Sequence, residues 1–326
     1  MTVLVTGVAG FIGSHVAHAL LARGERVLGL DSLNDYYDVN LKRARLARLA
    51  DAKGFTFVQA DVADRAALTA AAAKAPDLDR IVHLAAQAGV RYSLTHPEAY
   101  IRANLEGHFA VIELCRGLKA FKHLVYASSS SVYGGNTKLP FSVEDRVDTP
   151  VSLYAATKRA DELMSHCYAH LYDLPMTGLR YFTVYGPWGR PDMAAFIFTR
   201  AILRDEPITL FNAGDMKRDF TFVDDAVRGT VAALDHPPAR AGGAAAHRVF
   251  NIGNHRSERL TRLVELIERE TNRKAKIVHA PLQPGDVKET YADIETSQRA
   301  LGFEPKTTID EGIPRFVAWY REYHKL

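Results

Sequence analysis

Three glycines stand directly after the first apolar run of the chain. The run TVLVT at 2–6 has the length and composition of a buried strand, and Gly7, Gly10 and Gly13 separate it from a helical pattern. Glycine in these places allows a tight turn, a close approach of the backbone to a phosphate group, and close packing of the helix on the strand. Three glycines alone are a weak signal, so their interpretation depends on the elements around them.

Short apolar runs recur along the first half of the chain, with helical patterns between them. Strands that alternate with helices predict a parallel sheet that is covered on both faces. The helical patterns are clearest at 12–23, 97–118 and 153–172. The sequence therefore predicts an α/β fold with a doubly wound parallel (Rossmann) sheet. The predicted strands are 2–6, 26–31, 55–61, 80–86, 123–129 and 176–182.

The sequence pattern changes after residue 182. Proline and glycine interrupt the sequence more often, and the strand–helix repeats become fewer. We expect a first domain over 1–182 and a smaller C-terminal α/β domain over 183–326, with some segments crossing back to the first domain. Within the second part, 237–247 predicts a surface loop before a strand at VFNIG, 249–253.

The composition is that of an ordinary globular protein. Of the 326 residues, 47% are hydrophobic and 24% are charged, and the formal net charge is +3. This charge is too small and too evenly spread to predict a nucleic acid or a membrane surface as a partner. The densest basic run, LKRARLAR at 41–48, is expected to form the solvated side of a helix. No apolar run reaches the ~18 residues that a membrane span requires.

The two cysteines, Cys115 and Cys167, belong to no CxxC pair and no histidine cluster. Packed, reduced thiols of this kind favour a cytoplasmic location, and the N-terminus lacks the basic region of a signal peptide. The histidines show no metal-ligand spacing such as HExxH, so we expect no metal site. His83 lies in the apolar pattern RIVHLAA and is expected to be a packed histidine rather than a catalytic base.

A carboxylate ends the second predicted strand. Asp31 follows Gly7 by 24 residues, where it can accept hydrogen bonds from both hydroxyls of an adenosine ribose. A 2′-phosphate would be repelled by this charge, so the motif favours NAD over NADP. The third strand ends in Asp61 and Val62, a suitable place to meet the adenine ring. The alternative is that the glycines serve only a turn and that Asp31 only caps a helix.

Two further motifs carry groups that can perform chemistry. YAATK at 154–158 places Tyr154 and Lys158 on one face of a predicted helix, and YASSSSVYGG at 126–135 places four serines at the end of a predicted strand. Together with the GxxGxxG spacing, these residues resemble the extended short-chain dehydrogenase/reductase superfamily, in its NAD-dependent epimerase/dehydratase family. The resemblance implies that NAD contacts Gly7, Gly10, Phe11, Ile12, Gly13, Asp31, Asp61, Val62, Leu84, Ala85, Ala86, Asn104, Tyr154, Lys158 and Tyr181.

The resemblance also implies a division of catalytic labour. A free tyrosine is a poor base at neutral pH because its pKa is about 10, but a nearby ammonium and a nicotinamide cation lower the pKa of a phenol. Tyr154 would take a proton from a sugar hydroxyl while Lys158 supplies the ammonium. Ser129 would hydrogen-bond the same hydroxyl and stabilise the developing carbonyl, since it lies 25 residues before Tyr154, as in sugar-nucleotide epimerases.

Four longer stretches, 33–46, 180–194, 217–227 and 283–293, narrow the resemblance to UDP-glucuronate 4-epimerases. UDP-glucose epimerases tend to have Asn where this chain has Thr183 and Arg where it has Gln283. The family pattern leads us to expect Arg at position 188, and Trp188 departs from it. By this resemblance Arg218 and Asp286 hold the nucleotide, with Gln283 nearby, and Thr183 and Arg190 grip the uronate carboxylate. The implied substrate contacts are Arg91, Ser129, Ser130, Thr183, Arg190, Arg218, Gln283 and Asp286.

Oxidation of a uronate at C4 gives a β-keto acid, which loses carbon dioxide readily when its carboxyl bond aligns with the carbonyl π system. We expect Thr183 and Arg190 to hold the carboxylate out of that alignment, because an arginine fork suits a planar carboxylate. The alternative for Arg190 is a loop arginine paired with Asp192, and Arg91 could equally be a structural residue.

The serines at 128–131 help to distinguish epimerisation from dehydration and decarboxylation. Related dehydratases and decarboxylases carry acids where this chain has Ser130 and Ser131. Without an acid there, oxidation at C4, rotation of the keto-sugar and reduction on its other face is the simplest course. The alternatives are a 4-epimerase of neutral UDP-hexoses, a net dehydrogenase, and a non-catalytic NAD-binding protein. Relatives are usually homodimers, so we expect a homodimer.

Overall fold

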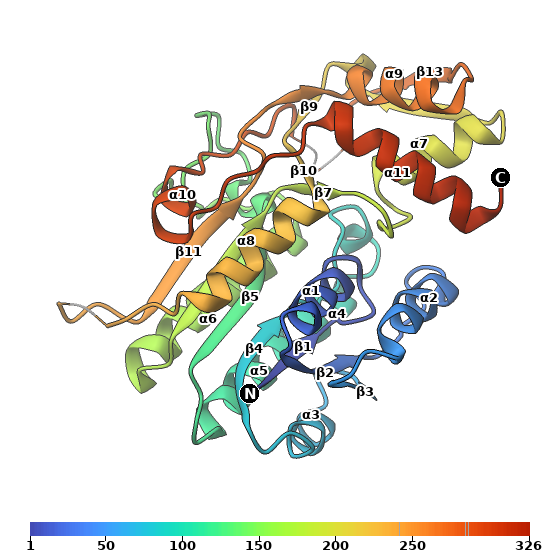
Figure 1. Cartoon of the computed structure of the whole chain (residues 1–326). Helices are drawn as coiled ribbons and strands as arrows, with labels where there is room; N and C mark the ends of the chain where they lie inside the picture. The colour runs from blue at the N-terminus through green and yellow to red at the C-terminus, as the bar shows by residue number, and fades with distance from the viewer. Residues whose placement is uncertain (241, 284, 286) are drawn as a thin grey trace.

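The computed structural model describes residues 1–240, 242–283, 285 and 287–326. Its centre is a seven-stranded sheet in the order β11-β6-β5-β4-β1-β2-β3, in which every neighbouring pair is parallel (Figure 1). This order is the doubly wound arrangement with one strand added at the edge, so the predicted fold class is confirmed. The strands are β1 Thr2–Thr6, β2 Arg26–Asp31, β3 Phe55–Gln59, β4 Leu78–His83, β5 His123–Ser129, β6 Met176–Tyr181 and β11 His247–Ile252.

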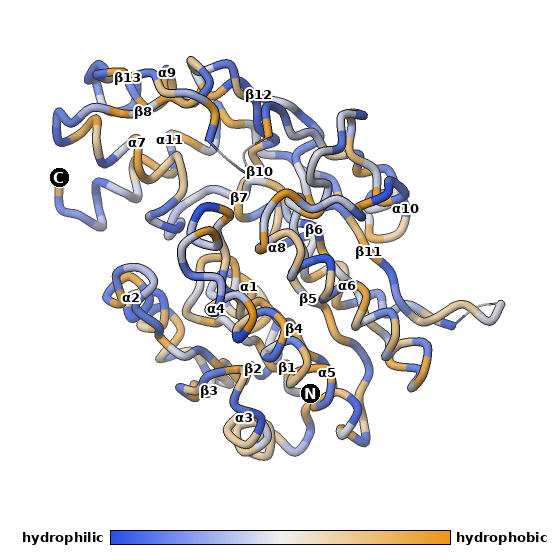
Figure 2. Tube along the Cα trace, turned by 180° about the vertical axis from the view of Figure 1, so that it is seen from behind, coloured by the Kyte–Doolittle hydropathy of each residue, from blue (hydrophilic) through white to orange (hydrophobic). Residues whose placement is uncertain are grey.

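The two faces of the sheet are buried against different helices. Val3 and Val5 of β1 belong to one apolar cluster, and Leu4, which points the opposite way, belongs to the other. The first cluster includes residues of α1 (Phe11–Ala22), α2 (Val39–Ala50) and α8 (Val223–Asp235). The second includes residues of α3 (Arg65–Ala72), α5 (Gly107–Gly117) and α6 (Leu153–Tyr172). Figure 2 shows the hydrophobic stretches gathered in the sheet and the helices that cover it.

The helix predicted over 97–118 is divided into three pieces. α4 (Pro97–Tyr100) continues into a π-helical turn, η2 (Ile101–Glu106), and then into α5. The wide turn carries Asn104, whose side chain accepts from the Gln87 backbone N–H at 2.8 Å and donates to the Thr157 hydroxyl at 2.9 Å. Apolar periodicity does not show a wide turn of this kind, which is often found at functional sites.

Two segments from the second half of the chain belong to the first sheet. β11 pairs with β6 at its edge, and α8 packs beside α1 (Figure 1). The remaining strands form three pairs, β7 (Thr183–Tyr185) with β10 (Phe220–Phe222), β8 (Pro207–Phe211) with β13 (Lys276–Ala280), and β9 (Lys217–Arg218) with β12 (Glu258–Arg259). The other helices here are α7 (Ala194–Leu203), α9 (Leu260–Thr271), α10 (Glu295–Leu301) and α11 (Ile309–His324).

Trp188, the residue that departs from the expected family pattern, packs against the C-terminal helix. Its ring lies 5.4 Å from the ring of Trp319 and 5.2 Å from that of Tyr323, both on α11. The Arg48 guanidinium lies 4.8 Å from the centre of the Trp188 ring. Tryptophan at 188, where the family resemblance leads us to expect arginine, therefore packs the loop at 186–190 on α11.

Among the described residues, none of the helices has the length and apolar character needed to cross a bilayer.

Candidate active site

The glycine turn between β1 and α1 brings the backbone into very close contact. Gly7 has a φ of 71°, and a Cβ built on it would lie 2.7 Å from the Ala85 backbone nitrogen. A Cβ on Gly13 would lie 2.1 Å from the Gly7 carbonyl oxygen. Neither position can carry a side chain, so strand, turn and helix pack as closely as a phosphate-binding turn requires.

Asp31 lies at the end of β2, beside this turn. Its carboxylate oxygens accept hydrogen bonds from the Ala9 N–H at 3.0 Å and the Leu33 N–H at 2.8 Å. Burial raises the pKa of Asp31, while these N–H groups and Lys42 act in the opposite direction. The buried carboxylate is thus fixed in orientation toward the cavity, which fits the two hydroxyls of a ribose.

One large cavity joins the glycine turn to the C-terminal part of the chain. Its volume is 1230 Å³, which is large enough for a dinucleotide and a second ligand. The structure places most of the predicted site residues along its wall. They are Gly7, Gly10, Phe11, Ile12, Gly13, Asp31, Asp61, Val62, Leu84, Ala85, Ala86, Arg91, Ser129, Ser130, Tyr154, Lys158, Tyr181, Thr183, Arg190 and Arg218.

Two predicted residues that the structure describes are not in the cavity wall. Asn104 is buried one layer behind it, where its amide holds the backbone of Gln87 and the side chain of Thr157. Gln283 is half-buried and does not line the cavity. Asp286 lies outside the described residues.

Tyr154 and Lys158 share one face of α6. Ser152 caps this helix, because its hydroxyl accepts from the Ala155 N–H at 3.1 Å. Lys158 is almost fully buried and its Nζ lies 3.0 Å from Asp161 Oδ2, while Tyr154 is half-buried. The pair and Ser129 line the same cavity, so a hydroxyl, a phenol and an ammonium can act on one substrate.

The serine run ends β5 and has several tasks. The hydroxyl of Ser128 donates to Glu162 Oε1 at 2.6 Å, and Glu162 is also paired with Arg180 at 2.8 Å. Ser129 accepts from the Ser131 N–H at 3.1 Å, and Ser130 begins the short helix η3 (Ser130–Tyr133). All four serines line the cavity, and Ser128 also supports the buried ion pair.

Arg190 is already engaged by an acid of its own loop. Its Nε donates to Asp192 Oδ1 at 3.0 Å, and the Tyr36 hydroxyl donates to Asp192 Oδ2 at 3.0 Å. Burial works against the charge of Arg190, but Asp192 and Tyr36 raise its pKa above the ordinary value. Pairing with Asp192, the alternative weighed from sequence, is present, and Arg190 lines the cavity as well.

Two further arginines line the cavity near the C-terminal part. The Arg218 guanidinium donates to the Lys217 carbonyl at 2.8 Å and to the Lys288 carbonyl at 3.2 Å. The Arg91 guanidinium lies 4.3 Å from the centre of the Phe211 ring. Both cations thus line the same cavity as Tyr154.

Arg45 is a residue that the sequence interpretation missed. The solvated helix side expected for 41–48 is wrong at Arg45, which is 0% exposed, and at Lys42, which is 5% exposed. Its guanidinium donates to the Ala9 carbonyl at 3.0 Å and to the carbonyls of Trp188 at 2.8 Å and Gly189 at 3.1 Å. Carbonyls that converge from two distant loops leave no sign in the local sequence, so no pattern could have identified this arginine.

The remaining candidates for chemistry are structural. His83 is buried, its Nδ1 lies 2.7 Å from the Thr6 hydroxyl, and burial lowers its pKa to about 3, so it is a neutral packed residue. Among the described residues, His, Cys, Asp and Glu side chains form no group of three that could hold a metal ion.

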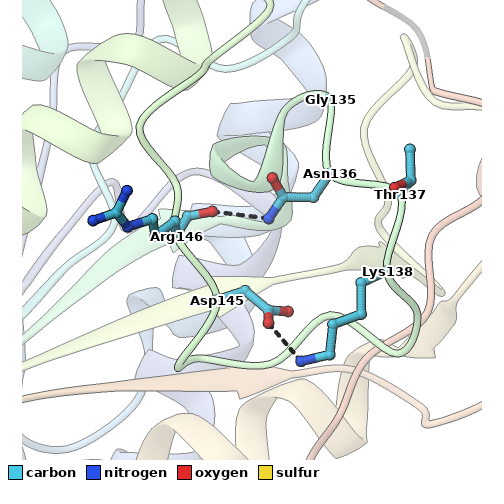
Figure 3. A pocket seen from close by; sticks show the side chains of 6 residues that line it. All are labelled: Gly135, Asn136, Thr137, Lys138, Asp145 and Arg146. Atoms are coloured by element: carbon cyan, nitrogen blue, oxygen red, sulfur yellow. Dashed lines mark hydrogen bonds and ion pairs between the residues drawn. The ribbon is translucent and has the colours of Figure 1, made fainter.

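A second hollow of 360 Å³ lies on the loop after η3. Figure 3 shows that Lys138 points toward Asp145, with which it pairs at 2.7 Å, and that Asn136 donates to the Arg146 backbone carbonyl at 2.8 Å. None of the predicted site residues lines it. The chemistry therefore belongs to the large cavity.

An enzyme that oxidises an alcohol with a bound dinucleotide needs a phosphate-binding turn beside groups that can move a proton. This cavity brings together the glycine turn and the side chains of Tyr154, Lys158 and Ser129. The chain belongs to the NAD-dependent epimerase/dehydratase family, whose sequence profile matches residues 3–253. Predicted family membership and the predicted cofactor NAD are thereby confirmed.

Three proteins illustrate the similarity. UDP-glucuronate 4-epimerase 3 of Arabidopsis thaliana is 49% identical over 99% of this chain and 77% of its own length. A UDP-glucuronic acid 4-epimerase of Bacillus cereus, solved with UDP-glucuronic acid and NAD, is 33% identical with a TM-score of 0.89, over 99% of this chain and 100% of that one. A UDP-glucose 4-epimerase of Thermotoga maritima, solved with UDP-glucose, is 30% identical with a TM-score of 0.88, over 99% and 100%.

Replacing Asp31 by alanine is expected to weaken NAD binding by about 10- to 100-fold and to reduce the preference for NAD over NADP. The variant loses an oriented carboxylate that is predicted to accept from the ribose and to repel a 2′-phosphate. Calorimetric titration of cofactor-stripped protein with each dinucleotide measures both effects. Asp51→Ala, at the exposed end of α2, is the control. An unchanged ratio of the two affinities would show that Asp31 does not select the cofactor.

Proposed function

We propose that the protein is a UDP-glucuronate 4-epimerase, which interconverts UDP-glucuronate and UDP-galacturonate by transient oxidation at C4. The observation that carries the proposal is that Arg190 and Thr183 line the same cavity as Tyr154 and Lys158. A guanidinium fork that suits a carboxylate thus lines the same cavity as the pair proposed to act on the sugar hydroxyl. The names of the Arabidopsis and Bacillus relatives support the same substrate.

The proposed roles follow from position and chemistry. NAD, when bound, accepts a hydride from C4 and returns it to the other face of the sugar. Tyr154 takes the proton of the C4 hydroxyl and gives it back in the reverse step. Ser129 donates to the developing carbonyl oxygen, and the Lys158 ammonium stabilises the phenolate of Tyr154.

The carboxylate is the group that distinguishes this substrate. We assign Thr183 and Arg190 to it, with Arg190 kept in place by Asp192 and Tyr36. A carboxylate held in one orientation keeps the 4-keto sugar from losing carbon dioxide while it turns. Arg218, Gln283 and Asp286 are assigned to the nucleotide, with Arg91 and Ser130 as further substrate contacts. In this proposal residues 1–182 form the NAD-binding domain and residues 183–326 the UDP-sugar domain, with β11 and α8 crossing back to the first sheet and Arg91 and Ser130 reaching the sugar from the first domain.

A second candidate is a 4-epimerase of neutral UDP-hexoses. It is favoured by the ion pair, since an Arg190 neutralised by Asp192 leaves less charge for a substrate carboxylate. The similarity to the Thermotoga UDP-glucose 4-epimerase points the same way.

Incubation with each sugar nucleotide separates the two candidates. Without added cofactor, the purified protein is expected to convert UDP-glucuronate to UDP-galacturonate, and to turn over UDP-glucose at least tenfold more slowly. Separation of the sugar nucleotides by anion exchange measures both reactions. Faster turnover of UDP-glucose would favour the neutral-sugar enzyme, and accumulation of NADH would indicate a net dehydrogenase.

We also propose a cytoplasmic homodimer joined through α5 and α6. Support comes from apolar side chains exposed on these helices, Phe109 on α5 and Leu163 and Leu171 on α6, the last being 59% exposed. Both cysteines are free thiols, which suits a reducing compartment, although the expected packing is wrong for Cys167, which is exposed, and holds only for the buried Cys115. Light scattering should give twice the mass of one chain, and half that mass for Leu163→Lys.

A further inference from the structure

A buried carboxylate stands directly behind the catalytic ammonium. Asp161 follows Lys158 by one turn of α6, and the distance from Lys158 Nζ to Asp161 Oδ2 is 3.0 Å. Asp161 is 0% exposed, and its second oxygen, Oδ1, has no hydrogen-bond partner within the described part of the chain. Such an arrangement costs stability, because half of the bonding capacity of a buried carboxylate stays unused.

The groups that face this pair from other elements carry no charge at neutral pH. Burial lowers the pKa of His83 on β4 to about 3 and that of His108 on α5 well below its ordinary value. Burial also raises the pKa of Tyr126 on β5, which therefore stays a phenol. On α6 itself, Glu162 is occupied by Arg180, with contacts of 2.8 and 2.9 Å.

Asp161 therefore supplies the negative charge that Lys158 meets in the described structure. Burial raises the pKa of Asp161 to about 6, although Lys158 acts to lower it. Near neutral pH the Asp161 carboxylate is ionised and lies 3.0 Å from Lys158 Nζ. Below pH 6 the carboxylate takes up a proton, and the ammonium is no longer offset.

We propose that Asp161 is a positioning residue that holds the Lys158 ammonium and sets how much positive charge it presents to Tyr154. This inference rests on the proposed function, since it requires Tyr154 to act as the base. A carboxylate beside the lysine offsets part of the field that stabilises the phenolate. The carboxylate thereby sets the pH at which the base becomes active.

Replacing Asp161 by asparagine removes the charge and keeps an oxygen that can accept from Lys158. Asp161 is seven residues from Tyr154, or about 10 Å along the helix. At an effective dielectric constant of about 20, one charge at that distance shifts the midpoint of a titration by about one pH unit. We expect the acidic limb of the kcat/KM profile to move down by about one pH unit, with the plateau changed by less than about threefold.

The experiment compares pH profiles of UDP-glucuronate epimerisation by the NAD-loaded wild type, Asp161→Asn and Asp79→Asn. Asp79 is the matched control, because it is 1% exposed and paired with Lys122 at 2.8 Å, but lies at the start of β4, away from the cavity. A shifted limb in Asp161→Asn alone supports the proposal. Superimposable profiles of the wild type and Asp161→Asn overturn it.

Two further measurements keep the outcome decisive. If Asp161→Asn does not fold, Asp161→Ala must show the same shift, and failure of both variants to fold would make the carboxylate a requirement of folding and overturn the proposal. If the wild type epimerises neither sugar nucleotide, the proposed function is wrong. In that case the ultraviolet titration of the Tyr154 phenol, taken as the difference from Tyr154→Phe, must still shift down in Asp161→Asn, and an unshifted titration overturns the inference.

Discussion

Tyr154→Phe is expected to lower kcat for epimerisation by about 10²- to 10⁴-fold, the usual contribution of a positioned general base. The phenylalanine ring fills the same space between Tyr100 and the cavity, so the fold and the binding of the sugar nucleotide should change little. The effect belongs in kcat because the lost proton transfer occurs only in the transition state. Steady-state rates and calorimetric binding of UDP-glucuronate measure the two quantities.

Tyr172→Phe is the matched control, because Tyr172 ends the same helix and is 45% exposed outside the cavity. It should retain full activity. A Tyr154→Phe enzyme with more than a tenth of the wild-type kcat would show that another group removes the proton.

Arg190→Ala is expected to raise KM for UDP-glucuronate by about 10- to 100-fold, because the proposed charge-assisted contact to the carboxylate would be lost. It should also release carbon dioxide and a UDP-pentose during turnover, since the freed carboxylate of the 4-keto sugar can align for decarboxylation. Anion-exchange separation of the products detects the pentose, and UDP-glucose serves as a substrate without the carboxylate.

Arg190→Lys separates charge from geometry. The lysine keeps the charge but not the planar fork. We therefore expect a smaller rise in KM for UDP-glucuronate than in Arg190→Ala, while the UDP-pentose still forms. If Arg190→Ala formed no UDP-pentose, restraint of the carboxylate by Arg190 would have to be abandoned.

The parts of the fold that were predictable from sequence are those that short-range patterns encode. Alternation of apolar strands and helices predicts the parallel sheet, and the glycines before α1 predict the turn, because both depend on neighbours in the chain. The YAATK motif likewise shows that Tyr154 and Lys158 share a helix face. Their roles in catalysis stay predictions until the variants are measured.

Long-range contacts explain what sequence did not show. The π turn at Asn104 depends on its bonds to Gln87 and Thr157, and the place of β11 depends on pairing with β6 across the sheet. The helical pattern of 41–48 looked solvated because nothing nearby shows that distant carbonyls surround Arg45. Asp161 was visible one turn after Lys158, but burial makes that contact important, and burial of one side chain depends on the whole fold.

The bonds of Arg45 have a mechanical consequence for the cavity. One guanidinium clamps the carbonyl of Ala9 in the cofactor turn to the carbonyls of Trp188 and Gly189, beside Arg190. Moving the 186–190 loop away would leave buried N–H groups of Arg45 without acceptors, at a cost of about 1–3 kcal/mol each. By the proposed roles, Arg45 therefore ties the loop that would face the sugar to the turn that would hold the dinucleotide, and the two binding regions would move together while the sugar turns.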